Sequence, residues 1–296
     1  MTSVAIMGST GMLGSTLAKV LESKDLTVYE FNRSGISVTG KAKAGKFNVL
    51  SDKSLDDLFE GLKLDYIVNC IGLIKHLINE ENPASIDMAY KLNADFPDIL
   101  NKFSVKHGIP VIEIGTDCVF SGKIGGYSEL DLFDPLDCYG LTKSIGESVN
   151  TSAMIIRSSI VGKELNSNNS LMSWVLSQPK YANINGFSNH IWNGVSTLHF
   201  SQVVFGIINS NSHMSGATHL VPKDIVSKYD LISYIASEFG RHDLIIHKTE
   251  AEIAVNRSLS TVKKEVNLKL WHQAGYNMIP TVKTMILDYK KWNNPY

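Results

Sequence analysis

The beginning of the chain has a short apolar run that stops at a glycine-rich turn and is followed by a helical pattern. Residues 4–7 are apolar, glycines stand at positions 8, 11 and 14, and leucine and valine recur at helical spacing up to Leu21. The first glycine permits a tight turn, the second lets the backbone approach a diphosphate, and the third allows the helix to pack closely on the strand. The order strand, turn, helix therefore predicts a dinucleotide-binding turn. The residues expected to contact the dinucleotide here are Gly8, Thr10, Gly11, Met12, Leu13 and Gly14.

The second predicted strand, residues 27–31, ends in a polar triplet that bears on the choice of cofactor. An acidic side chain at this end binds the adenosine ribose hydroxyls of NAD, whereas an arginine suits the 2′-phosphate of NADP. Arg33 stands there and favours NADPH, with NADH as the alternative. A third strand is expected over residues 45–50. The residues assigned to this part of the cofactor site are Asn32, Arg33, Ser34, Asn48 and Val49.

Strand and helix patterns alternate along the first half of the chain. The further strands are expected over 66–72, 111–114 and 154–157, and the helices over 54–62, over 83–107 and from residue 139 onward. This alternation is typical of an α/β fold with a doubly wound parallel sheet.

After residue 157 the alternation loosens. We expect a polar loop over 166–169, an irregular stretch over 181–193 and a strand over 216–221, with helices over 171–176, 200–208 and 228–239. The prediction is a Rossmann domain for NAD(P) over 1–157, to which 195–212 returns. Residues 158–296 are expected to form mainly a smaller, C-terminal substrate-binding lobe.

The composition excludes several classes of protein. With 296 residues, 44% of them hydrophobic, the chain can bury a large core, and its net charge of −1 gives no attraction to nucleic acid or to a membrane surface. The cysteines Cys70, Cys118 and Cys138 are odd in number and lack metal-ligand spacing, so reduced thiols and no metal are expected. No signal peptide or membrane-length apolar run is expected, and the predicted compartment is the cytoplasm.

A tyrosine and a lysine four residues apart form a candidate proton-transfer site. On a helix Tyr139 and Lys143 project from one face. A lysine charge favours the phenolate and lowers the pKa of a tyrosine from its ordinary value of about 10. Thr116, at the end of the preceding strand, can offer a hydroxyl to the same substrate oxygen. The alternative is an amphipathic helix with a buried ring and a solvated lysine, and the rest of the chain favours the site.

Taken together, these residues resemble the extended short-chain dehydrogenases/reductases, and within them the dTDP-4-dehydrorhamnose reductase-like branch. The glycine turn matches, and Thr116–Gly122 is similar to the family's Thr-Asp-Tyr-Val-Phe-Asp-Gly. Asn69–Gly72 corresponds to its Asn-Ala-Ala segment, Asn93 to its helix asparagine, and Tyr139 and Lys143 follow in register. Weaker similarities extend to Asn256–Leu259.

The resemblance implies an NADPH-dependent reduction of the C4 keto group of a nucleotide-linked 4-keto-6-deoxy sugar, in the synthesis of polysaccharide or glycan precursors. Tyr139 donates a proton to the nascent alkoxide, Lys143 holds the nicotinamide ribose and tunes Tyr139, and Thr116 hydrogen-bonds the sugar oxygen. Further cofactor contacts implied in this way are Cys70, Ile71, Gly72 and Asn93. The implied substrate contacts are Thr116, Asp117, Cys118 and Ile160.

Departures from the family pattern leave alternatives open. Related dehydratases carry a glutamate where this chain has Cys118, so dehydration is not expected. GDP-fucose synthases use a cysteine at that spacing as an epimerisation base, and a reductase that also epimerises, through Cys118, is one alternative. Ile160 replaces a tryptophan of the family, which leaves the identity of the nucleotide and of the sugar open.

A second alternative is a non-catalytic NADP-binding regulatory subunit, like the methionine adenosyltransferase partner. Extended members are often dimers, so a homodimer is also considered.

Overall fold

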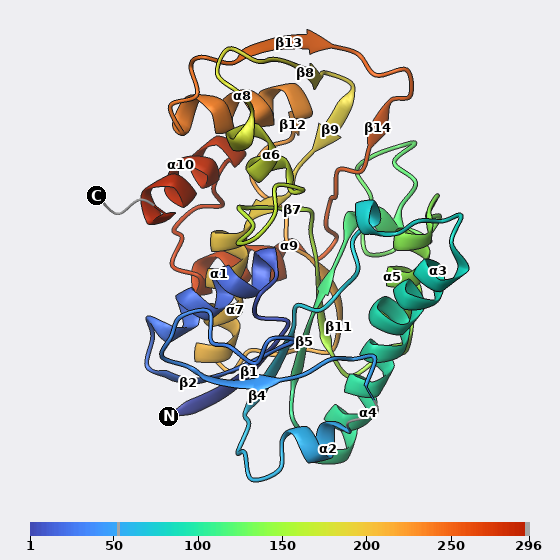
Figure 1. The fold of residues 1–296 in the computed structure, drawn as a ribbon, viewed down its shortest axis with the longest axis vertical. Helices are drawn as coiled ribbons and strands as arrows, with labels where there is room; N and C mark the ends of the chain where they lie inside the picture. Colours follow the sequence, from blue (N-terminus) through green and yellow to red (C-terminus); the bar gives the residue numbers. More distant parts are fainter. Residues whose placement is uncertain (52–53, 294–296) are drawn as a thin grey trace.

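The computed structural model describes residues 1–51 and 54–293, and its centre is a seven-stranded parallel sheet (Figure 1). The strands lie in the order β11-β6-β5-β4-β1-β2-β3. Their bounds are β1 Thr2–Met7, β2 Leu26–Asn32, β3 Lys43–Lys46, β4 Tyr66–Asn69, β5 Val111–Gly115, β6 Met154–Arg157 and β11 Gly216–His219. The order reverses at β1, which lies between β2 and β4. In open parallel sheets, ligands bind at such a reversal, beyond the carboxyl ends of the strands.

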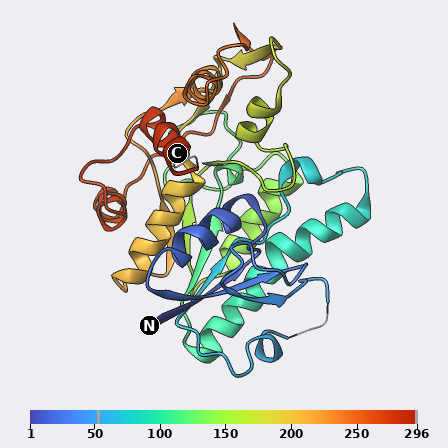
Figure 2. The ribbon, with the colours of Figure 1, turned by 60° about the vertical axis from the view of Figure 1, so that its left-hand side comes forward.

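Helices cover both faces of the sheet, because the strands alternate apolar side chains between two cores. In β1, Val4 and Ile6 belong to one core, and Ala5 and Met7 to the other. Helices α1 (Met12–Glu22) and α7 (Thr197–Asn209) lie side by side on the first face, as Figure 2 shows. The other face carries α2 Leu55–Leu58, α3 Pro83–Tyr90, α4 Phe96–His107 and α5 Cys138–Val149. The protein therefore has a Rossmann-like α/β fold, as predicted.

The long helical region predicted over 83–107 is present and contains one wide turn. Residues Lys91–Asp95 form a π-helix between α3 and α4. Pro97 has no N–H to donate to the carbonyl of Asn93, and in a regular α-helix its ring would clash with that carbonyl. The π-helical turn accommodates this proline within a continuous helical segment.

Most of the remaining elements form a lobe beyond the carboxyl edge of the sheet, whereas α9 packs against α7 and β11 beside the sheet (Figure 1). Three small sheets pair β7 with β10, β9 with β12 and β14, and β8 with β13. The strands are β7 Ile160–Val161, β8 Asn183–Phe187, β9 His190–Trp192, β10 Val195–Ser196, β12 Val226–Ser227, β13 Ile245–Thr249 and β14 Val255–Asn256. The helices are α6 Leu171–Ser177, α8 Lys228–Glu238, α9 Lys264–Gln273 and α10 Val282–Asn293, and short 3₁₀ turns occupy Lys75–Leu77 and Asp117–Val119.

Several predicted segments differ from the structure. The helix predicted over 54–62 is only Leu55–Leu58, and the strands predicted over 66–72 and 216–221 end at Asn69 and His219.

The third strand is Lys43–Lys46 and not 45–50, because its last residue, Lys46, pairs with Asn32, where the neighbouring strand β2 ends. Asn48 and Val49 therefore lie in the loop beyond the strand. The stretch 181–193 is not irregular, since it contains β8 and β9, whose partner strands come from residues 226–256. Partners so far along the chain leave no local signal.

The second half of the chain returns to the sheet twice. Helix α7 packs on α1 within the predicted segment 195–212, and β11 pairs with β6 from Gly216↔Met154 to His219↔Arg157. The strand β11 lies outside that predicted segment, and the division at residue 157 stays a prediction. In the described part of the chain, no helix has the length and apolar character needed to cross a membrane.

Candidate active site

The glycine turn joins β1 to α1 in the geometry that its sequence predicts. Gly8 has φ +83°, in the left-handed region, and a Cβ on Gly14 would lie 2.2 Å from the Gly8 carbonyl oxygen. Gly11 is the N-cap of α1 and provides no side-chain hydrogen bond to the first amides. Thr10 and Gly11 are exposed, whereas Leu13 and Gly14 are buried. The free amides of an exposed helix start suit an anionic group such as a diphosphate.

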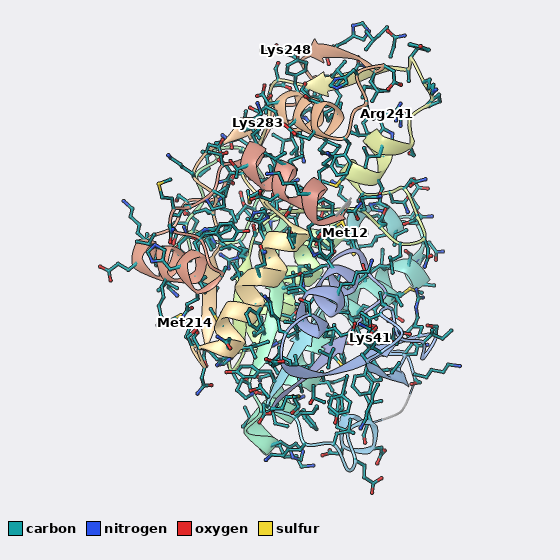
Figure 3. The ribbon with its side chains drawn as sticks, turned by 90° about the vertical axis from the view of Figure 1, so that its left-hand side faces the viewer. Met12, Lys41, Met214, Arg241, Lys248 and Lys283 are labelled. Atoms are coloured by element: carbon teal, nitrogen blue, oxygen red, sulfur yellow. The ribbon has the colours of Figure 1, made fainter. Side chains whose placement is uncertain are left out.

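Asn32 and Arg33, at the end of β2, have different surroundings. The buried Asn32 amide donates to Ser9 Oγ at 2.8 Å and accepts from the Ser34 and Gly35 amides at 3.0 and 2.9 Å, so it builds the loop. Arg33 is exposed, and within residues 1–51 and 54–293 no ion pair engages it. Asn48 is exposed and Val49 half-buried in the neighbouring loop. In Figure 3, Met12, at the start of α1, lies between Lys41 on the sheet side and Arg241 in the lobe.

Asn93 holds the loop that follows β4. Its amide oxygen accepts from the Leu73 N–H at 2.8 Å, and its amide nitrogen donates to the Leu73 carbonyl at 2.9 Å and to Thr142 Oγ1 at 3.1 Å. Both amide protons are thus used within the protein. The side chain thus joins Leu73, which directly follows Cys70–Gly72, to α5, and a direct contact of Asn93 with a cofactor stays a prediction.

Thr116 and Tyr139 meet at the carboxyl edge of the sheet. Thr116 directly follows β5 and accepts a hydrogen bond from the Cys118 N–H at 3.2 Å, and Tyr139 is the second residue of α5. The start of α5 can approach the backbone of Cys118 because Gly140 has no side chain. A Cβ there would lie only 2.2 Å from the Cys118 carbonyl oxygen. The Thr116 side chain lies close enough to the Tyr139 phenol to influence its pKa. The structure therefore brings together two of the predicted catalytic groups.

The electrostatics of Tyr139 are set mainly by its burial. Burial raises the pKa of the Tyr139 phenol above its ordinary value, the Cys118 charge adds to this effect, and the nearby Thr116 side chain opposes it. Lys143 Nζ lies 3.4 Å from Glu113 Oε1, in a buried ion pair. Lys143 is not among the groups with the largest effect on the Tyr139 phenol, since its ammonium pairs with Glu113, and the expectation that Lys143 lowers the pKa of Tyr139 stays a prediction.

The lobe brings two cations toward the predicted substrate residues. Burial raises the pKa of the Asp117 carboxyl, and the charges of Lys228 and Arg257 oppose that rise. The Lys228 ammonium lies 5.4 Å from the Trp192 ring centroid, and Arg257 Nε donates to the Phe120 carbonyl at 2.9 Å. Ile160 is half-buried in β7.

Neither cation was among the residues predicted for the site. Arg257 lies in the segment Asn256–Leu259 whose similarity to the family was noted, so a signal for it existed. Lys228 opens a predicted helix and gave no such signal.

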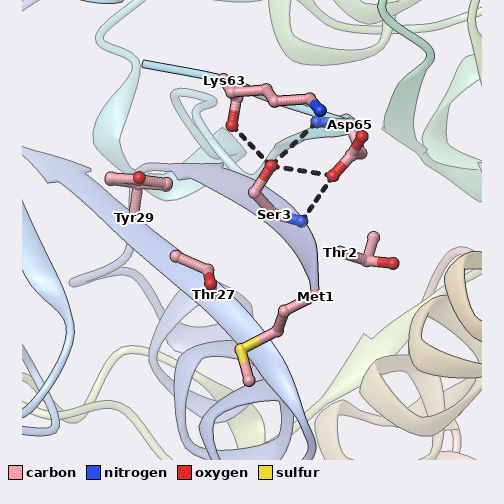
Figure 4. A pocket seen from close by; sticks show the side chains of 7 residues that line it. All are labelled: Met1, Thr2, Ser3, Thr27, Tyr29, Lys63 and Asp65. Carbon is pink, nitrogen blue, oxygen red and sulfur yellow. Dashed lines mark hydrogen bonds between the residues drawn. The ribbon is translucent and has the colours of Figure 1, made fainter. Parts of the chain in front are cut away.

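A hollow of about 420 Å³ lies at the edge of the sheet opposite to the candidate site, where the amino ends of β1 and β2 are (Figure 4). It is lined by Tyr29, Asp65 and neighbouring residues, and Ser3 Oγ lies 2.6 Å from the Lys63 carbonyl oxygen and 2.9 Å from Asp65 Oδ2, either of which can accept its proton. Its position separates it from the carboxyl-edge site. Among the described residues, no group of three or more His, Cys, Asp or Glu side chains is placed to hold a metal.

Comparison with known proteins agrees with this geometry. The sequence profile of the RmlD substrate binding domain matches residues 1–270, and the chain belongs to this family. A dTDP-4-dehydrorhamnose reductase from Aggregatibacter actinomycetemcomitans is 24% identical over 249 residues, which cover 80% of this chain and 79% of that protein. The rat methionine adenosyltransferase 2 subunit beta is 29% identical over 164 residues, 52% of this chain but only 45% of that protein.

The fold is shared with solved structures over nearly the whole chain. The dTDP-4-dehydrorhamnose reductase from Bacillus anthracis, solved in complex with NADP, superposes with a TM-score of 0.75 at 19% identity and covers 98% of this chain and 99% of that one. The resemblance drawn from the sequence is thereby confirmed.

Proposed function

We propose that the chain is an NADPH-dependent reductase of the C4 keto group of a nucleotide-linked 4-keto-6-deoxy sugar, a precursor of polysaccharides or glycans. The observation that carries the proposal is that Thr116, directly after β5, and Tyr139, at the start of α5, lie together at the carboxyl edge of the sheet, the same edge as the glycine turn. Membership of the RmlD family, with its dTDP-4-dehydrorhamnose reductase relative, supports the same activity.

The residues at the sheet edge fit a dinucleotide. The close approach of Gly14 to Gly8 leaves no room for a side chain, and the start of α1 has amides without a side-chain cap. Arg33 is exposed at the end of β2, where a 2′-phosphate is recognised in such sheets. A structural relative was solved with NADP. When bound, the dinucleotide supplies the hydride, with NADPH favoured and NADH as the alternative.

In this proposal Tyr139 is the proton donor. The phenol is protonated near neutral pH, so that it can give its proton to the oxygen that becomes an alkoxide when C4 is reduced. The Thr116 hydroxyl donates a hydrogen bond to the same oxygen and orients the sugar. Lys228 and Arg257 add positive charge on the lobe side, which suits a nucleotide sugar with an anionic diphosphate.

The two alternative functions have less support. Burial raises the pKa of Cys118 to about 12, so it is a thiol near neutral pH and a poor base for epimerisation. A regulatory subunit like methionine adenosyltransferase 2 subunit beta has no use for a proton donor, which the Thr116–Tyr139 pair provides. A homodimer stays a prediction, and the elution volume with light scattering decides it.

The test follows the absorbance of NADPH, and of NADH in parallel, while the protein meets 4-keto-6-deoxy sugars on dTDP, UDP and GDP. Oxidation with one nucleotide series is expected, and Tyr139→Phe is expected to lower the rate by about 10²-fold or more. Tyr181→Phe, at an exposed tyrosine, serves as the matched variant with unchanged rate. Full turnover by Tyr139→Phe contradicts the assignment of the donor. No oxidation by a protein that binds NADPH favours the regulatory subunit.

A further inference from the structure

A glutamate is buried in the middle of the sheet, directly beneath the candidate site. Glu113, in β5, is 2% exposed. Its Oε2 accepts a hydrogen bond from Asn69 Nδ2 at 2.8 Å, and its Oε1 lies 3.4 Å from Lys143 Nζ. The side chains of the ion pair are 3% and 10% exposed for Glu113 and Lys143. A carboxylate in this position would be costly without its cation.

The groups that face Glu113 come from two neighbouring elements. Helix α5 contributes Lys143 and the more distant Glu147, which is itself paired with Arg157. The end of β4 contributes Asn69 and the thiol of Cys70. Burial raises the pKa of the Glu113 carboxyl, whereas Lys143 and Asn69 hold it down. Lys143 is therefore the cation that faces this carboxyl and favours its ionised form.

We propose that Glu113 is a positioning residue that holds the Lys143 ammonium in the free protein, and that dinucleotide binding exchanges this partner and draws a proton onto Glu113. The inference rests on the proposed function for its dinucleotide. When the ammonium turns from Glu113 toward the dinucleotide, the carboxylate loses its cation while it stays buried. One proton then passes from solvent to Glu113 and replaces, beside the carboxylate, the positive charge that the ammonium supplied.

Calorimetry of NADPH binding tests the proton uptake. Titrations at pH 8 in phosphate and in Tris, buffers with different ionisation enthalpies, give the number of protons taken up per NADPH. We expect the wild type to take up more protons than Glu113→Gln, with a difference that approaches one. Protonation of the NADPH phosphate itself contributes equally to both proteins. Equal uptake by the two proteins overturns the inference.

Glu30→Gln is the matched variant for this titration. Glu30 is also fully buried in a strand, and its carboxylate accepts from Ser37 Oγ at 2.7 Å and from the Val38 N–H at 2.8 Å. It lies outside the pair with Lys143, so its replacement is expected to leave the proton uptake unchanged. Glu113→Asp, which keeps the charge, is expected to restore part of the uptake. A loss of uptake in Glu30→Gln as well contradicts the assignment to Glu113.

A measurement on the free protein separates this inference from the proposed function. The surroundings of the Lys143 ammonium are followed by NMR of ¹³C-methylated lysines, with the Lys143 signal assigned from Lys143→Arg. Loss of the carboxylate in Glu113→Gln is expected to change the chemical shift of this signal, whereas Glu30→Gln leaves it unchanged. An unchanged Lys143 signal in Glu113→Gln overturns the positioning role. Failure of the wild type to bind NADPH contradicts the proposed function, whereas this spectrum still decides the role of Glu113.

Discussion

Gly14 sets the distance between the first helix and the first strand. A methyl group there would lie 2.2 Å from the Gly8 carbonyl oxygen, which belongs to the backbone and cannot move aside on its own. Gly14→Ala is therefore expected to lower the free energy of unfolding by about 2–3 kcal/mol, measured by urea denaturation without ligand.

Gly11→Ala is the natural comparison for this experiment. Gly11 has φ −70°, and its Cβ would lie 3.4 Å from the same oxygen, so the cost to stability is expected to stay below about 1 kcal/mol. Because Gly11 is exposed at the turn, this variant is instead expected to weaken NADPH binding. Equal destabilisation by the two variants contradicts the close-packing argument.

At the residue scale, the sequence predicts where a side chain lies in the fold better than it predicts which other side chains it contacts. The glycine spacing specifies the turn, and the placement of Thr116 after a strand and Tyr139 in a helix specifies that both lie at the carboxyl edge. The partner of Lys143 could not be predicted, because it depends on which strand lies beside β5 and which way Glu113 points. A signal was nevertheless present: Glu113 interrupts the otherwise apolar segment 111–114. A charge in a buried strand calls for a nearby counter-ion.

At the scale of elements, a buried polar cluster joins α5 to the strands β6 and β11. Arg157 pairs with Glu147 and donates to His219 Nε2, and His219 Nδ1 donates to the Ser260 carbonyl at 2.6 Å. Arginine has only donors, so this arrangement requires a neutral imidazole with its proton on Nδ1. The cluster thus depends on the protonation state of one histidine.

This cluster predicts a loss of stability in acid. Burial and the charge of Arg157 lower the pKa of His219 to about 4. Between the ordinary value of about 6.5 and about 4, the unfolded chain binds more protons than the folded one, so stability falls as the pH falls through this range. From pH 7 to pH 5 the contribution of His219 is a loss of about 2 kcal/mol.

The measurement is urea denaturation of the wild type and of His219→Gln at pH 7 and pH 5. The variant is expected to be less stable at pH 7 but to lose about 2 kcal/mol less on acidification. His242→Gln, at an exposed histidine, is expected to behave as the wild type does. The same acid sensitivity in His219→Gln and wild type would assign the effect to other groups.

Elements with strong local patterns were predicted correctly, whereas elements fixed by distant partners were not. Helix α8 and strand β5 carry their own apolar patterns, and their predicted positions are confirmed. The strand β3 has the sequence Lys-Ala-Gly-Lys and is defined by its pairing with β2. Similarly, β8 and β9 depend on strands that occur more than 30 residues later in the chain.

At the scale of the whole molecule, the sheet is completed by residues from the second half of the chain. The edge of β6 is covered by β11, and the apolar side of α1 is covered by α7. A fragment of residues 1–157 is therefore expected to lack a cooperative thermal transition by circular dichroism, whereas the full chain shows one. A fragment that unfolds cooperatively would establish 1–157 as an independent domain and contradict this expectation.

The alternation of strands and helices predicts the doubly wound sheet because each strand must be buried on both faces. The return of β11 could not be predicted from this pattern. Its residues, Gly216–His219, carry little apolar character, and the strand owes its place to pairing with Met154–Arg157. The sequence at the end of β6, where the chain leaves the sheet, does not indicate that a later strand will pair with β6.

The late return of β11 also has a consequence for synthesis on the ribosome. After Arg157 has been added, residues 158 to 219 must still be made, a further 62 residues, before the last strand of the sheet exists. At translation rates of about 5–20 residues per second, this takes about 3–12 s. During that interval the emerging chain presents the open edge of β6 and the uncovered side of α1, both suited to nonspecific association. The nascent protein is thus a natural client for chaperones that bind near the ribosomal exit.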